Sequence, residues 1–139
     1  MKKLFKSALS LLLVLALLFT FIACNKVPAE GKWENATYRS DKTFGEGEKT
    51  VTVLITAEEQ TLTFTIKTDK ADLGEALREH GLTEEDNGLI HTINGIKADF
   101  NDGGWWWMFT KNGEMMMLGA NDTPIADGEQ YEFTRTNTF

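Results

Sequence analysis

The sequence predicts an α+β fold, in which one helix packs on one face of a mixed β-sheet. Two stretches, Lys49–Thr56 and Thr61–Thr68, alternate apolar and polar residues, which is the period of a half-buried strand. One stretch after Asp69 has helical spacing, and later segments are divided by Asn-Gly and Asp-Gly turns. An order of two strands, one helix and three or four further strands is typical of a small α+β domain.

The first two strands are predicted to form a hairpin. Glu58-Glu59-Gln60 lies between them as a polar turn, and the β-branched residues on either side favour strands. The residues predicted to face inward are Val51, Val53, Ile55, Leu62, Phe64 and Ile66.

The single helix is predicted to begin after Asp69. An aspartate is a favoured N-cap, and Asp72 would place a second carboxylate in the first turn. Apolar residues then follow at helical spacing, and Gly81 is expected to end the helix. The residues of this apolar stripe are Leu73, Ala76 and Leu77.

The later strands are short and are separated by tight turns. The turns are Asn94-Gly95, Asn112-Gly113 and Asp127-Gly128, and such pairs favour two-residue hairpin loops. The predicted strands are Leu89–Ile93, Trp105–Lys111 with its partner Glu114–Leu118, and Gln130–Arg135. This order of elements fits a β-grasp-like sheet.

The hairpin around Asn112-Gly113 is predicted to be apolar on both faces. Directly paired residues share a face, so this turn would pair Lys111 with Glu114 and Trp107 with Leu118. One face would then carry Trp105, Trp107, Phe109, Met116 and Leu118, and the other Trp106, Met108, Thr110, Met115, Met117 and Gly119. We expect the first face to meet the helix and the core.

The second face has no further helix in the sequence to cover it. Exposed aromatic and methionine side chains are typical of surfaces that bind an apolar ligand or a partner. The predicted ligand-binding residues are Trp106, Met108, Met115 and Met117. The alternative is that Trp33–Phe44 folds over this face and makes it part of the core.

The N-terminus has the pattern of an export signal. Met1–Lys6 is basic, Ala8–Ala23 is almost wholly apolar, and Cys24, the only cysteine, follows at once. This arrangement resembles a bacterial lipoprotein signal, in which the cysteine receives a diacylglyceryl group. An ordinary secretory signal and an uncleaved anchor are the alternatives. As an anchor, these 16 residues would reach only about 24 Å, short of the roughly 30 Å hydrocarbon core.

The predicted organisation is therefore a lipoprotein signal at 1–23, a flexible membrane tether at 24–32 and one domain at 33–139. The expected location is the bacterial cell envelope, on the extracytoplasmic side of the membrane. Without residues 1–23 the chain has 11 basic and 21 acidic residues, a net charge of −10. Such a surface repels nucleic acid, which excludes it as a partner.

No catalytic or metal-binding motif is evident in the sequence. The two histidines, His80 and His91, show no zinc spacing, and there is no nucleophile motif or phosphate loop. The run Glu84–Asp86 could bind a cation but is typical of a solvated loop, and Asp99–Asp102 lacks the later glutamate of a calcium loop. We therefore expect a protein that is not an enzyme and that requires no cofactor.

A series of short motifs in a fixed order resembles the DUF4430 family. They are Asn94–Ala98, Trp106–Phe109, Asn112–Glu114, Gly119–Asp122, Asp127-Gly128 and Tyr131–Phe133, preceded by Ala36–Tyr38, Gly45–Gly47 and Leu73–Leu77. The family is similar to the C-terminal β-grasp domain of transcobalamin and intrinsic factor. The resemblance implies a β-grasp fold, a non-catalytic role and a corrinoid as a candidate ligand, although the helical domain that helps to hold the corrinoid is missing here.

These observations lead to two hypotheses about function. The first is a membrane-anchored extracytoplasmic module, held through Cys24, that binds a small amphipathic molecule such as cobalamin and acts beside a membrane transport protein. The second is a protein–protein interaction module at the cell surface without a small ligand. Tethering favours the first hypothesis, because it raises the effective concentration near a partner in the same membrane.

Overall fold

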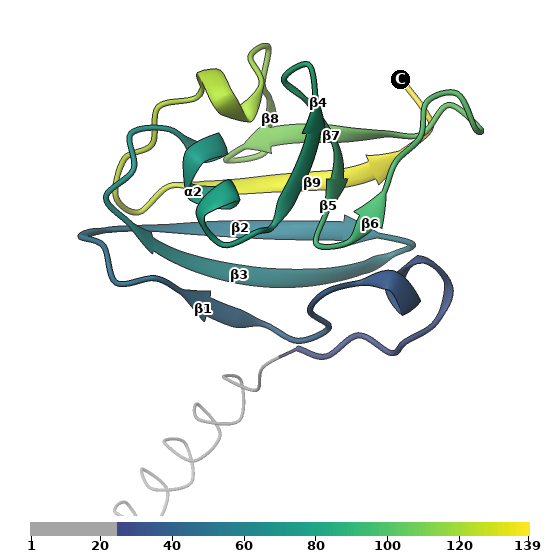
Figure 1. Cartoon of the computed structure of the whole chain (residues 1–139), viewed down its shortest axis with the longest axis horizontal. Helices are drawn as coiled ribbons and strands as arrows, with labels where there is room; N and C mark the ends of the chain where they lie inside the picture. The colour runs from purple at the N-terminus through teal and green to yellow at the C-terminus, as the bar shows by residue number, and fades with distance from the viewer. Residues whose placement is uncertain (1–24) are drawn as a thin grey trace, which may run out of the picture.

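The computed structural model describes residues 25–139. The predicted signal and the predicted lipidation site, Cys24, lie outside the described residues. The main feature is a six-stranded mixed sheet (Figure 1). In spatial order its strands are β1 (Lys42–Phe44), β3 (Gln60–Thr68), β2 (Lys49–Ala57), β9 (Gln130–Thr136), β7 (Trp106–Lys111) and β8 (Glu114–Met115). The pairs β1–β3 and β2–β9 are parallel, and the other pairs are antiparallel.

The β2–β3 hairpin forms as predicted. Its turn residues Glu58 and Glu59 have φ values of 50° and 65°, which are the left-handed conformations of a tight hairpin turn. The residues predicted to face inward, Val51, Val53, Ile55, Leu62, Phe64 and Ile66, are fully buried.

A second layer covers one face of this sheet, which we call the inner face. The layer consists of α2 (Leu73–Glu79) and a three-stranded sheet of β4 (Thr83–Asp86), β5 (Leu89–Ile93) and β6 (Ile96–Lys97), both in front of the large sheet in Figure 1. The predicted α+β class with one helix on one face is confirmed, and the arrangement is β-grasp-like. The sequence predicted a solvated loop at Glu84–Asp86 instead of β4, because this stretch has no apolar alternation to indicate a strand.

The helix begins three residues later than predicted. Its N-cap is Asp72, whose Oδ1 accepts a hydrogen bond of 2.8 Å from the backbone N–H of Glu75. Asp69, the predicted cap, accepts instead from the backbone N–H of Glu48, at 2.9 Å. The helix ends at Glu79, and Gly81 follows with a φ of 64°, consistent with its predicted role as the stop.

Residues predicted to form a tether are packed on the domain. Val27 is 4% exposed, and its N–H bonds to the carbonyl of Arg39 at 2.7 Å. A spacer was predicted because this stretch is polar overall, and one valine in a polar stretch gives no signal of packing. The short helix η2 (Gly31–Asn35) then buries Trp33, whose indole N–H donates to the carbonyl of Ala57 at 2.9 Å.

The segment Trp33–Phe44 does not cover the predicted apolar hairpin. Tyr38 and Phe44 pack edge-to-face with Phe64 on β3, and the backbone N–H of Tyr38 bonds to Asn94 Oδ1 at 2.9 Å. These contacts lie at the β3 side of the sheet, three strands away from β7. The segment therefore closes the opposite edge of the core.

The second face of the six-stranded sheet, which we call the outer face, is formed mainly by half-exposed threonines. The strand registers place Thr50, Thr52, Thr56, Thr61, Thr63, Thr65, Thr110, Thr134 and Thr136 on it, together with Leu54 and Glu132. Over residues 25–139, no helix has the length and apolar character needed to cross a membrane.

Candidate ligand-binding site

Three of the four predicted ligand-binding residues lie together on the outer face. The register pairs Trp106 with Thr136 and Met108 with Thr134, and Met115 with Thr110. Met115 is 58% exposed, whereas Trp106 and Met108 are half-buried. The inward partners in the same strand, Trp107 and Phe109, are each 9% exposed. The predicted assignment of the two faces of β7 is thus confirmed, and the binding role of the outer residues stays a prediction.

Met117, the fourth predicted residue, lies apart from the other three. The prediction that the strand runs to Leu118 is wrong, because β8 ends at Met115. The backbone N–H of Met116 still bonds to the carbonyl of Phe109 at 2.9 Å, but the chain then turns toward η3 (Ala120–Asp122). The period of two is lost there, so Met117 and Leu118 do not follow the predicted faces.

Met117 belongs instead to an apolar hollow on the inner side of the molecule. The hollow has a volume of about 230 Å³ and lies between the tip of the β4–β5 hairpin and the loop that follows β8. Its lining residues are Gly88, Leu89, Ile90, Phe109, Met116, Met117, Leu118, Gly119, Ala120 and Phe133. Three of them are large apolar residues left open to solvent, with exposed fractions of 74% for Leu89, 93% for Met117 and 56% for Leu118.

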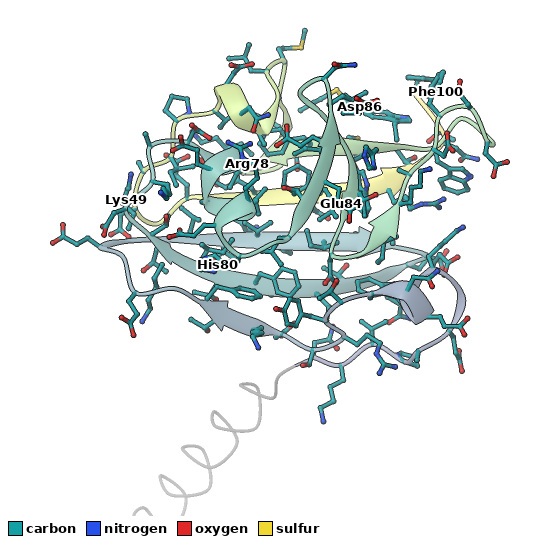
Figure 2. The ribbon with its side chains drawn as sticks, in the orientation of Figure 1. Lys49, Arg78, His80, Glu84, Asp86 and Phe100 are labelled. Carbon is teal, nitrogen blue, oxygen red and sulfur yellow. The ribbon has the colours of Figure 1, made fainter. Side chains whose placement is uncertain are left out.

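A larger hollow, with charged as well as apolar side chains in its wall, adjoins the first. It has a volume of about 610 Å³ and shares Leu89 and Ile90 with the apolar hollow. Asp86, at the end of β4, and Phe100, in the loop after β6, line it and are labelled in Figure 2. The other lining residues are Asn87, His91, Lys97, Ala98, Asp99, Asn101 and Trp105. The two hollows together run along β5. One end, near Met117, has an apolar wall, and the other end has charged side chains such as Asp86 and Lys97 in its wall.

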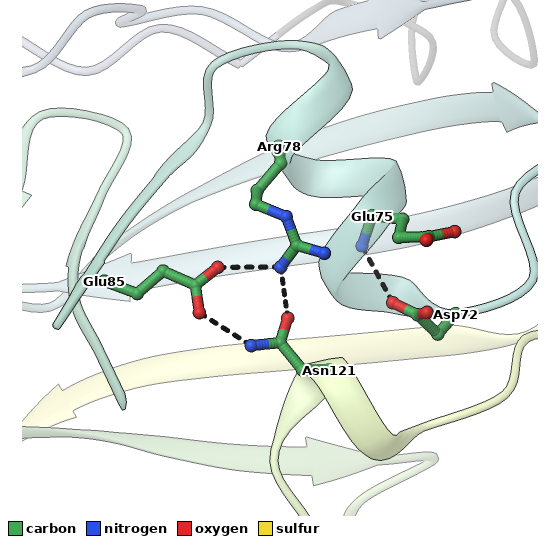
Figure 3. Close-up of polar contacts among 5 residues, drawn as sticks. All are labelled: Asp72, Glu75, Arg78, Glu85 and Asn121. Atoms are coloured by element: carbon green, nitrogen blue, oxygen red, sulfur yellow. Dashed lines mark hydrogen bonds and ion pairs between the residues drawn. The ribbon is translucent and has the colours of Figure 1, made fainter. Parts of the chain in front are cut away.

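A polar network fixes the two segments that border the apolar hollow (Figure 3). The Arg78 guanidinium on α2 donates to Glu85 Oε1 on β4 at 2.7 Å and to Asn121 Oδ1 on η3, and Asn121 Nδ2 donates to Glu85 Oε2 at 2.6 Å. The hydrogen bond from Asn121, with the hydrogen bond and charge of Arg78, lowers the pKa of Glu85 despite the opposing effect of burial. Glu85 therefore stays ionised at neutral pH and holds the hairpin against the η3 loop.

Gly74 makes the close approach of Asn121 to the helix sterically feasible. A β-carbon on Gly74 would lie 1.8 Å from Asn121 Oδ1 and 2.9 Å from Asn121 Cα. Because such distances are far below van der Waals contact, only glycine fits at this point of α2.

The sequence reading missed both Leu89 and the network. The predicted strand Leu89–Ile93 is confirmed as β5, but the place of Leu89 at a hairpin tip depends on β4, which was not predicted. The turn Asn87-Gly88, with φ values of 51° and 81°, was the local signal that could have indicated a hairpin. Asn121 was part of a recognised motif, but nothing in the sequence indicates its partners.

The histidines and carboxylates do not form a metal site in the part of the chain that the structure describes. His91 Nδ1 lies 2.8 Å from Thr92 Oγ1, and His80 packs on the ring of Phe44 at a centroid distance of 5.2 Å. Among residues 25–139, no group of three or more His, Cys, Asp or Glu side chains could hold a metal ion.

The fold and the open hollow define a small β-grasp-like domain with a surface suited to binding. A family model described as "Domain of unknown function (DUF4430)" matches residues 71–137. The chain belongs to this family, as the motifs predicted.

Several solved structures are similar to this chain, and two of them are described here. A protein from Ruminococcus gnavus, provisionally described as metal binding, is 31% identical with a TM-score of 0.62, and the match covers 66% of this chain and all of that one. Haptocorrin in complex with Cbi is 20% identical with a TM-score of 0.49, and the match covers 69% of this chain and 27% of haptocorrin. A search of curated proteins found no match.

Proposed function

We propose that this protein is a membrane-anchored, extracytoplasmic module that binds a small amphipathic ligand in the apolar hollow. The observation that carries the proposal is the gathering of Leu89, Met117 and Leu118 around one hollow while all three remain mostly exposed. Apolar side chains are rarely collected in this way on a surface without a binding role.

The neighbouring hollow supports an amphipathic rather than a purely apolar ligand. Small-molecule sites occupy roughly 300–1,000 Å³, and the apolar hollow of about 230 Å³ is too small by itself. The adjoining hollow adds about 610 Å³ with Asp86, His91 and Lys97 in its wall. A ligand that spans both would place its apolar part near Met117 and its polar part near Lys97. Corrinoids have this amphipathic character and are our candidate ligands.

Ligand binding is tested by titrating cobinamide and cobalamin into the purified protein while tryptophan fluorescence and corrin absorbance are recorded. We expect saturable quenching that is weakened in Leu89→Ser and Met117→Ser. The matched control is Met115→Ser, since Met115 is also exposed but lies on the outer face. If Met115→Ser weakens binding and the other two variants do not, the ligand binds the outer face and the hollow is not the site.

The membrane anchor is proposed from the sequence pattern around Cys24. We expect metabolic labelling with an alkyne fatty acid to modify the wild-type protein and not Cys24→Ser, which should appear in the medium or the soluble envelope fraction. A labelled Cys24→Ser protein would contradict the proposal. Crosslinking from the hollow to an integral transport protein, lost in Leu89→Ser, would support a role in handing the ligand to a transporter.

A protein–protein interaction module is the second candidate function. It is favoured by the outer face, which carries Trp106, Met108 and Met115 with few charges on a chain that is otherwise strongly acidic. If no corrinoid binds and a Trp106→Ser, Met115→Ser double variant abolishes a defined complex, this second function replaces the first.

A further inference from the structure

Arg135 is a buried cation with unused hydrogen-bond donors. It lies on the inner face of β9, where it is only 9% exposed. Its Nε–H donates to the carbonyl of Lys97 at 2.8 Å, and its Cζ lies 3.9 Å from the centre of the Trp105 ring. Within residues 25–139, neither Nη atom makes a hydrogen bond or an ion pair, although a buried guanidinium is normally paired.

The guanidinium faces a hollow that is distinct from the apolar one. This Arg135 hollow has a volume of about 450 Å³ and lies between η2 and the loop that follows β6. Its lining residues are Lys32, Glu58, Lys97, Asp99, Asp102, Gly103, Trp105 and Arg135. Lys97, Asp99 and Trp105 also line the larger hollow next to the apolar site, so the two open side by side.

Two carboxylates of the lining hold other groups of the protein. Glu58 Oε2 accepts from the backbone N–H of Lys32 at 2.9 Å. Asp99 Oδ1 accepts from the backbone N–H of Asn101 at 3.0 Å, and its Oδ2 lies 3.5 Å from Lys97 Nζ. Burial lowers the pKa of Arg135, and the charge of Glu58 only partly opposes this. Neither Nη atom is among the fully buried polar atoms that lack a partner, so both reach the solvent of the hollow, where a ligand can replace the water.

The geometry points to a binding site for a small monocarboxylate on Arg135. A guanidinium presents two parallel N–H donors that match the two oxygens of a carboxylate. Trp105 lies against one face of the guanidinium and fixes the orientation of its plane. The Nη–H donors, which lie in that plane, remain available to a ligand. This site does not depend on the proposed corrinoid site.

The balance of charges around the hollow selects for a single negative charge. Three cationic side chains, Lys32, Lys97 and Arg135, share the lining with three acidic ones, Glu58, Asp99 and Asp102. Either anion can pair with the guanidinium, but the carboxylates of the lining repel a dianion such as phosphate about twice as strongly as a monoanion. We therefore expect carboxylate to bind more tightly than phosphate.

The test is a titration of protein purified from cells expressing the full chain, with sodium benzoate and sodium phosphate as probes at constant ionic strength. NMR signals of the Arg135 Nε–H and the Trp105 indole N–H report binding directly. We expect saturable benzoate shifts with a Kd of about 1–10 mM. Arg135→Lys should weaken binding about tenfold, because lysine keeps the charge but loses the bidentate fork.

Two other variants keep the test decisive if changes at Arg135 disturb folding. Asp102→Asn removes an exposed negative charge and should tighten benzoate binding about twofold. Arg39→Gln removes an exposed guanidinium outside the hollow and should leave binding unchanged. The inference is overturned if benzoate causes no saturable shift at either signal, if phosphate binds more tightly than benzoate, or if Asp102→Asn weakens binding.

Discussion

The inner and outer faces of the six-stranded sheet are built from the same strands but have different neighbours. On β7 the inward residues Trp107 and Phe109 are buried under the second layer. The outward residues Trp106 and Met108 remain half-buried, and no second layer of helices or strands from residues 25–139 lies above them. Strand alternation assigns each side chain to a face, and burial then depends on whether another element is available to cover that face.

The two faces also differ in the types of residue that are exposed to solvent. The outer face is largely threonine, whose methyl and hydroxyl groups suit a half-exposed strand. The rim of the inner side instead leaves leucine and methionine exposed around a hollow. Threonine is common on an open sheet face, whereas clustered exposed leucine is not. The residues around the apolar hollow therefore indicate a binding site better than the outer face does.

The strongest test of this comparison is a pair of tryptophan substitutions. Trp107→Ala should lower the free energy of unfolding by about 3–5 kcal/mol, because it empties a large buried volume. Trp106→Ala should cost only about 1–2 kcal/mol, since that ring is half-exposed and its buried indole N–H has no hydrogen-bond partner among residues 25–139. Urea denaturation followed by circular dichroism measures both values. Equal costs would mean that the two faces are equally buried.

A glycine substitution tests the packing of the second layer. Alanine for glycine inside a helix usually stabilises by about 1 kcal/mol. Gly74→Ala should instead destabilise by about 1–3 kcal/mol, because its β-carbon would meet Asn121. Gly119→Ala is the matched control, since its added β-carbon would meet nothing within 4 Å. A stabilised Gly74→Ala in thermal denaturation would show that Asn121 is not held against the helix.

The network around Glu85 predicts a pH dependence. The folded-state pKa of Glu85 is lowered, so its stabilising effect is fully present above the unfolded-state pKa and is lost as pH falls through the folded-state pKa. Glu85→Gln should cost about 1 kcal/mol at pH 7, a modest value because Arg78 is partly exposed. Denaturation of both proteins across acidic pH should show this difference shrinking. A difference independent of pH would exclude the charged form as its source.

The smallest effect is expected at the C-terminus. Phe139 stacks on Trp106 at a centroid distance of 5.5 Å, but it is 98% exposed, so the contact covers little of its area. Phe139→Ala should change the free energy of unfolding by less than about 0.5 kcal/mol. A larger loss would show that the last residues protect part of the outer face.

Local patterns predicted much of the fold but less of the candidate site. The alternating residues from Val51 to Ile66 and the turn at Asn112-Gly113 were recognisable, because strand period and turn chemistry act over a few neighbouring residues. The strand β4 could not be recognised, since Thr83–Asp86 pairs through its backbone and contains no apolar side chain. Without β4, the hairpin tip at Leu89 and the hollow beside it had no basis in the sequence.

The helix cap and the methionines show how neighbouring elements modify such predictions. Asp69 and Asp72 are both suitable caps, and the choice depended on the bond between Asp69 and the distant backbone of Glu48. Met115 kept its predicted face because it is paired with Thr110, whereas Met117 lost it when the chain turned toward η3. A period of two applies only while the ladder continues.

The order of residues thus specified the class of fold, the main hairpins and the two faces of β7, since these depend on contacts close along the chain. Three-dimensional packing determined which apolar residues stay open, because Leu89 and Met117 are brought to one hollow by the distant partners Arg78, Glu85 and Asn121. The unpaired donors of Arg135 likewise depend on which side chains lie near it in space. These neighbours are distant along the chain, so the local sequence around Arg135 does not indicate them.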